Sequence, residues 1–112
     1  MIEIRWATEQ EVMAVSGEVP LNRPITDILD DWRPVAVVQA QDGNQQILLG
    51  LHLVGLRRST GRTICASPVM LIDIGPGCAR TASGSVYLLA SEADGPMPER
   101  VALGLVRHLL FR

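Results

Sequence analysis

The chain has 112 residues, 47% of them hydrophobic, which is typical of one globular domain over residues 1–112 and argues against disorder. All ten basic residues are Arg, so lysine Schiff-base chemistry and the lysine of a phosphate-binding P-loop are excluded. The formal net charge is −2, yet residues 1–42 carry three Arg against eight acidic residues and residues 43–91 carry four Arg against one Asp, a pattern that we interpret as two oppositely charged faces.

The first third of the chain predicts one strand and two short helices. Apolar and charged residues alternate over Ile2–Trp6, as in a half-buried strand. Thr8 and Glu11 have the spacing of a capping box, so we expect a short helix over Glu9–Ser16. A second helical turn is expected within Thr26–Pro34, where Thr26 can cap the start and the proline ends it.

From Val35 onward, short β-rich runs separated by turn residues predict an antiparallel meander. Val35–Val38 and Gln46–Leu56 flank an Asp-Gly-Asn turn and are expected to form a hairpin. The second of these strands is apolar on both faces, so we expect it to be central and covered on both sides. Further strands are expected at Thr63–Ser67, Val69–Ile74, Cys78–Ala82 and Val86–Ala90.

The last element is a helix over Glu99–Phe111, preceded by Pro98 at a position that suits the first turn. Apolar residues surround most of its circumference, so we expect it to pack on the sheet and against something else as well. The predicted fold is α+β, with a mostly antiparallel, curled sheet of five or six strands, a small barrel being its most curled form, a C-terminal helix and a short N-terminal helix.

No metal or cofactor is predicted. The four residues that can ligate zinc, Cys65, Cys78, His52 and His108, lack the short spacing that preorganises two ligands. Without an N-terminal signal sequence, we expect reduced thiols and a cytoplasmic protein. The most apolar segment, Ile47–Leu56, is too short to cross a membrane.

The sequence also lacks a catalytic motif. Ser83 and Ser85 lie between β-rich runs and are expected to be turn residues. His52 lies in an apolar strand, where we expect a hydrogen-bonded core imidazole. Asp73 can pair with Arg80, accept turn amides or take part in chemistry with His52, in that order of preference. We therefore predict that the protein is not an enzyme, with hydrolysis as the less favoured reading.

Two charged clusters remain. Asp27, Asp30 and Asp31 lack the later ligands of a calcium loop, so we expect a solvated helix face. The loop between the third and fourth predicted strands is rich in Arg and can bind an anion, although a solvated hairpin tip is the favoured interpretation. The candidate anion-binding residues are Arg57, Arg58, Arg62 and Arg80. The low aromatic content, 4%, disfavours nucleic acid as the ligand.

About half of the chain resembles a family of small bacterial proteins of unknown function. The residues that carry this resemblance are Trp32-Arg33-Pro34-Val35, Leu49-Gly50, Gly55, Thr63, Ala66-Ser67-Pro68, Asp73 and the run from Ala79 to Leu88. The family pattern is a Thr-Ser-Pro step, an Asp, an Ala-Arg-Thr run and a Tyr-x-Leu close, and Ala66 stands here where the family has Thr. The resemblance implies no activity, but it implies that Pro68, Arg80 and Tyr87 belong to one structural unit.

The function that follows is a non-catalytic interaction or regulatory module. We expect a homodimer or a complex with a protein partner, formed through the last helix or through an exposed sheet edge. The candidate interface residues of the helix are Leu105, Leu109 and Phe111. The alternative is binding of an anion or a nucleic acid by the Arg-rich loop, with no membrane partner in either case.

Overall fold

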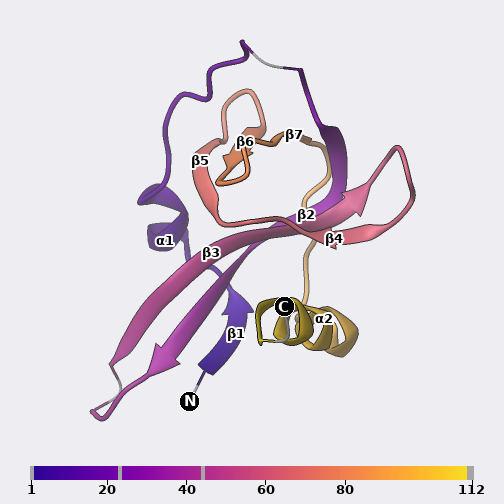
Figure 1. Cartoon of the computed structure of the whole chain (residues 1–112). Helices are drawn as coiled ribbons and strands as arrows, with labels where there is room; N and C mark the ends of the chain where they lie inside the picture. Colours follow the sequence, from indigo (N-terminus) through magenta and orange to yellow (C-terminus); the bar gives the residue numbers. More distant parts are fainter. Residues whose placement is uncertain (1, 23, 44, 111–112) are drawn as a thin grey trace.

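The computed structural model describes residues 2–22, 24–43 and 45–110, with side chains up to residue 107. Within these residues it contains seven strands and two helices (Figure 1). They are β1 (Ile2–Trp6), α1 (Glu9–Met13), β2 (Asp27–Ala40), β3 (Gln46–Arg57), β4 (Thr63–Cys65), β5 (Val69–Asp73), β6 (Cys78–Thr81), β7 (Val86–Leu89) and α2 (Glu99–Leu110).

All seven strands belong to one open, mixed sheet with the order β4-β3-β2-β7-β6-β5, and β1 also pairs with β2. β2 is long enough to pair with two strands in succession along one edge. Its first residues, Asp27–Leu29, run parallel to β7, and its last half is antiparallel to β1. The α+β class, the C-terminal helix and the short N-terminal helix are confirmed. The sheet differs from the prediction, because it has seven strands instead of five or six, is mixed instead of mostly antiparallel, and is not closed.

The segment predicted as a second helix is the first part of β2. Leu29 and Trp32 are spaced like two residues on one face of a helix. In the structure both belong to strand β2, and both side chains still lie in the same core cluster. The reason is a β-bulge, because the pairing of β2 with β3 shifts register between Asp30 and Arg33. Asp31 lies there with φ 49°, and the extra residue returns Trp32 to the face of Leu29.

α1 is shorter than the predicted helix. The capping box is confirmed, because Glu11 N donates to Thr8 Oγ1 and Thr8 N donates to the Glu11 carboxylate. The chain leaves the helix after Met13 because the next residues pair with the outer edge of β5. Ile72 N donates to Val15 O at 2.9 Å, and Gly17 N donates to Ile72 O at 3.1 Å. This edge of the sheet is therefore covered by the chain itself.

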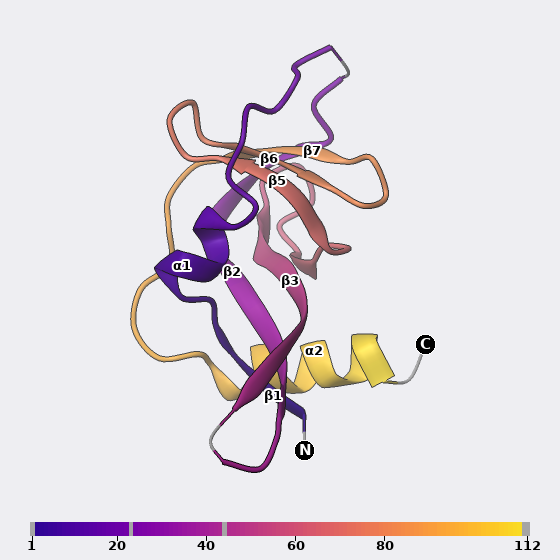
Figure 2. The ribbon, with the colours of Figure 1, turned by 90° about the vertical axis from the view of Figure 1, so that its left-hand side faces the viewer.

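The buried apolar side chains of the described residues form three clusters, two of which lie on opposite faces of the β2–β3 hairpin. One face packs with β5–β7 and with α1 through Leu29, Leu53 and Ile72. On the other face, Leu105 of α2 packs on Val35 and Val54. Figure 2 shows the result, with α1 and β5–β7 on the upper part of the hairpin and α2 crossing its lower part. β3 is thus covered on both sides only around its middle.

Candidate functional site

The most unusual surface is one edge of the lower part of β3, which we call the β3 edge segment (Gln46–Gly50). β2 pairs with one side of this segment, whereas β4 pairs with the other side of β3 only over Val54–Leu56. Among the residues that the structure describes, no strand pairs with the outer side of the segment. Its backbone N–H and C=O groups on that side are therefore open to another strand.

Three consecutive side chains of the β3 edge segment are apolar and exposed. Ile47, Leu48 and Leu49 are 46%, 42% and 51% exposed, although the sequence predicted burial on both faces of this strand. That prediction is wrong here because the hairpin extends beyond the elements that cover its middle (Figure 1). Leu49 is also the extra residue of a second β-bulge, since Val37 pairs with Gly50 and Val38 with Leu48. The sequence signal for this surface was three consecutive large apolar residues close to a hairpin turn.

α2 packs on the face of the sheet that carries Val35 and Val54. Both views place the helix beside β1 (Figures 1 and 2). A helix of 12 residues is about 18 Å long, and neighbouring strands are about 4.8 Å apart. The helix is therefore long enough to cross about four strands, and Val101, Gly104 and Leu105 of α2 line a cavity together with Thr63–Cys65 of β4.

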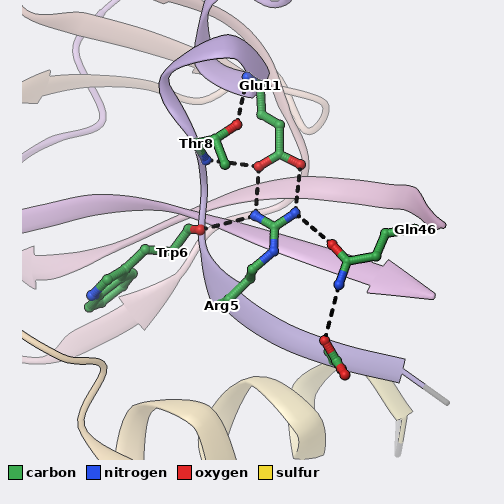
Figure 3. Close-up of polar contacts among 6 residues, drawn as sticks. Arg5, Trp6, Thr8, Glu11 and Gln46 are labelled. Atoms are coloured by element: carbon green, nitrogen blue, oxygen red, sulfur yellow. Dashed lines mark hydrogen bonds and ion pairs between the residues drawn. The ribbon is translucent and has the colours of Figure 1, made fainter. Parts of the chain in front are cut away.

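A polar network fixes the opposite face of this part of the sheet (Figure 3). Arg5 of β1 donates to both carboxylate oxygens of Glu11, at 2.8 and 3.1 Å, and to Gln46 Oε1 at 3.1 Å. The hydrogen bond and the charge of Arg5 hold the pKa of Glu11 below its usual range. The network joins α1 to the first residue of β3, so the segment starts from a fixed position.

A cavity of about 330 Å³ lies beside the β3 edge segment, between the sheet and α2. It is lined by Ile2, Ile4, Val37, Leu49, Gly50, His52 and Val106. His52 is only 3% exposed, and its Nδ1 lies 3.0 Å from the carbonyl oxygen of Ala66. The expected core imidazole is therefore present and hydrogen-bonded. Asp73 does not line this cavity, so the two residues of the hydrolytic reading do not share it.

The acidic cluster of β2 neutralises part of the Arg-rich loop. Asp27 is buried and accepts from Arg57 Nε at 2.7 Å and from the Ser59 hydroxyl. Arg58 pairs with Asp30 at 2.7 Å. The Ser59 hydroxyl and Arg57 hold the pKa of Asp27 well below its usual range, and Arg58 lowers the pKa of Asp30. The expected solvated helix face is thus part of strand β2, and two of its three carboxylates, those of Asp27 and Asp30, pair with β3 and the loop that follows it.

The structure does not bring all four candidate anion-binding residues together. Arg62 is exposed at the end of the β3–β4 turn, whereas Arg80 is half-buried on β6, in the register position opposite Leu71. The ion pairs formed by the described residues do not include the predicted pair of Asp73 with Arg80. Asp73 instead pairs in the ladder with Cys78, and burial followed by the charge of Asp73 raises the pKa of that thiol.

Of the predicted interface residues, only Leu105 has a described side chain, while the side chain of Leu109 and all of Phe111 lie outside the described part. Leu105 points from α2 into the core, where its side chain is 1% exposed, so it is not available to a partner. The neighbouring Leu103 is 61% exposed. α2 therefore uses its inner face within its own chain.

Other predicted features are placed as follows. Ser83 and Ser85 lie in the β6–β7 turn, where Ser83 Oγ is 3.0 Å from Thr81 Oγ1. Both cysteines are thiols, and in the described residues no three His, Cys, Asp or Glu side chains group closely enough to hold a metal ion. Neither of the helices described has the length and apolarity that crossing a bilayer needs.

The unit of Pro68, Arg80 and Tyr87 is one piece of the sheet. Pro68 O accepts from Ala82 N at 2.8 Å, and β6 pairs with β7 so that Ala79 lies opposite Tyr87. The resemblance that suggested this unit stays a prediction. Comparison of the chain with protein-family models, with curated proteins and with solved structures gave no match.

Proposed function

We propose that this chain is a non-catalytic interaction module that self-associates, with two copies pairing in antiparallel fashion along the β3 edge segment. The observation that supports this proposal best is the combination of an open strand edge with three exposed apolar side chains, Ile47, Leu48 and Leu49. A strand that adds to such an edge gains backbone hydrogen bonds and covers apolar surface at the same time.

Soluble proteins usually protect an open edge with a Lys, a Pro or an inward-pointing charge. The β3 edge segment contains none of these, since its sequence is Gln-Ile-Leu-Leu-Gly and the chain has no Lys at all. By contrast, the outer edge of β5 is covered by Val15–Gly17. The bulge at Leu49 is the only protective device on the segment, so a partner strand is the simplest way to cover it.

A second copy fits this edge because the segment is compatible with itself. A two-fold axis brings the same uncharged residues opposite one another, so no like charges meet. Asp42 precedes the segment and the exposed Arg62 follows it, so an antiparallel partner places its acidic turn near the basic loop.

Anion binding by the Arg-rich loop is the weaker proposal. Arg57 and Arg58 already contact Asp27 and Asp30, so a phosphate or carboxylate has to compete with these carboxylates. Arg62 adds one exposed charge. Nothing in the geometry of the described loop brings Arg80 to the same place.

The test is the molar mass of the chain in solution. Light scattering after gel filtration should give twice the 12.2 kDa of one chain. Leu48→Lys places a charge on the shared edge and should give a folded monomer. Leu21→Lys, at a leucine that is even more exposed (59% against 42%) but lies between α1 and β2, should stay dimeric. A wild-type monomer at the highest soluble concentration, or a dimer that survives Leu48→Lys, contradicts the proposal. Heparin binding that falls steeply with salt would favour the Arg-rich loop instead.

A further inference from the structure

The cavity beside His52 contains a polar atom without a partner. A carbonyl oxygen can only accept a hydrogen bond, so the contact of His52 Nδ1 with Ala66 O places the ring hydrogen on Nδ1. Nε2 of the neutral ring is then an acceptor. Among the hydrogen bonds of the described residues, none reaches Nε2. No side-chain nitrogen or oxygen atom of these residues is both sealed from solvent and without a partner, so Nε2 is open to the cavity.

Gly50 keeps this atom accessible. In a strand, residues two apart lie on the same face, and Gly50 is therefore next to His52 on the side of the cavity. A Cβ atom at position 50 would lie 3.1 Å from His52 Nε2, which is tighter than an ordinary contact. The missing side chain leaves space in front of the acceptor, and a glycine two residues before a histidine in a strand is the sequence signal for this arrangement.

The rest of the lining determines what can enter. Ile4, Val37 and Val106 are aliphatic, and the half-exposed Ile2 and Leu49 lie at the mouth. None of the described residues that line the cavity carries a charged side chain, so a charged ligand group would lose its hydration without compensation from them. A ligand that is apolar except for one donor satisfies every group present.

We infer that this cavity binds a small, uncharged, apolar molecule that donates one hydrogen bond, through an N–H or O–H group, to His52 Nε2. Aromatic N–H heterocycles and phenols have this chemistry, and the volume of about 330 Å³ accommodates one such molecule. The site is built from residues of one chain, and two of its lining residues, Leu49 and Gly50, also belong to the β3 edge segment.

The experiment compares indole with 1-methylindole, which has nearly the same shape but no N–H donor. With the full chain labelled in ¹⁵N, indole should shift the His52 Nε2 resonance in a saturable way, and 1-methylindole should bind about tenfold more weakly. Gly50→Ala, whose methyl group crowds Nε2, should remove the preference for indole. Val106→Phe, which fills the cavity, should remove the binding of both probes.

His52→Phe should bind the two probes equally, and if this variant does not fold, the comparison of the two probes on the wild-type chain decides alone. Equal affinity of the wild-type chain for both probes overturns the inference. So does the absence of saturable indole binding up to its solubility limit, or indole binding that is unchanged in Val106→Phe. Circular dichroism of each variant shows whether the fold is retained.

Discussion

The packing of α2 on the sheet can be tested with two leucines that are two residues apart on the same helix. Leu105 is 1% exposed and packs with Val35 and Val54, whereas Leu103 is 61% exposed. Replacing each by Ala removes the same atoms and has the same small effect on helix propensity. The difference between the two variants therefore measures burial alone.

The expected magnitude follows from the environment of each side chain. Leu105→Ala removes a fully buried side chain and leaves a cavity, which costs about 2–5 kcal/mol of unfolding free energy. A domain of this size loses about 4–5 °C of Tm per kcal/mol, so Tm should fall by about 10–20 °C. Leu103→Ala should change the unfolding free energy by no more than about 0.5 kcal/mol, or about 2 °C.

The assay is urea unfolding followed by circular dichroism, with thermal unfolding as a second measurement. Both variants should unfold in one transition with the slope of the wild type, because only stability is expected to change. Equal midpoints for Leu103→Ala and Leu105→Ala would refute the placement of α2. So would a larger loss for Leu103→Ala, which would mean that the helix presents its other face to the sheet.

Two further predictions concern charge and glycine. Because the folded state holds the pKa of Asp27 below its usual value of about 4, the ionised carboxylate stabilises the fold fully above that pH, and this stabilisation is lost as the pH falls. Asp27→Asn should therefore lower the free energy of unfolding at pH 7 and make this free energy depend less on acid pH. Asp42→Asn, at an exposed position, should keep the wild-type dependence of the unfolding free energy on pH, as measured by urea unfolding. Gly104→Ala, with open space around an exposed helix position, should stabilise the chain by about 1 kcal/mol. Gly55→Ala places a Cβ 3.1 Å from a buried carbon of β2 and should destabilise by about 1–3 kcal/mol. A change of unfolding free energy with the same sign for Gly104→Ala and Gly55→Ala would contradict the surroundings that the structure gives to these two glycines.

Local signals predicted the elements well where each element depends on its own residues. The capping box of Thr8 and Glu11 is present, and strands occupy the middle of every β-rich run from Val35 to Leu89. Turns between these runs were visible because Pro fixes its own φ and Gly permits backbone conformations that other residues rarely adopt. Gly77, for example, has φ 77° at the end of the β5–β6 turn, where other residues would be strained.

Pairings between distant segments were not visible in the sequence. The parallel contact of β2 with β7 joins residues near Asp27 to residues near Tyr87, and no turn links them. The same contact converts the predicted helix at Thr26–Pro34 into a strand, because Thr26 N donates to Val86 O at 2.7 Å. Propensity is a weak preference, and a long-range ladder overrides it.

The candidate site could be predicted only in its parts. His52 was expected to be a satisfied imidazole, but which of its nitrogens faces a cavity depends on Ala66, which follows β4. Likewise, Leu48 and Leu53 are the same residue type on one strand, and only coverage makes one exposed and the other buried. The apolar sequence of β3 is continuous, whereas the elements that cover it end before the hairpin does. An apolar strand therefore indicates burial only as far as the rest of the fold extends, and the part beyond that limit is where a binding surface should be sought.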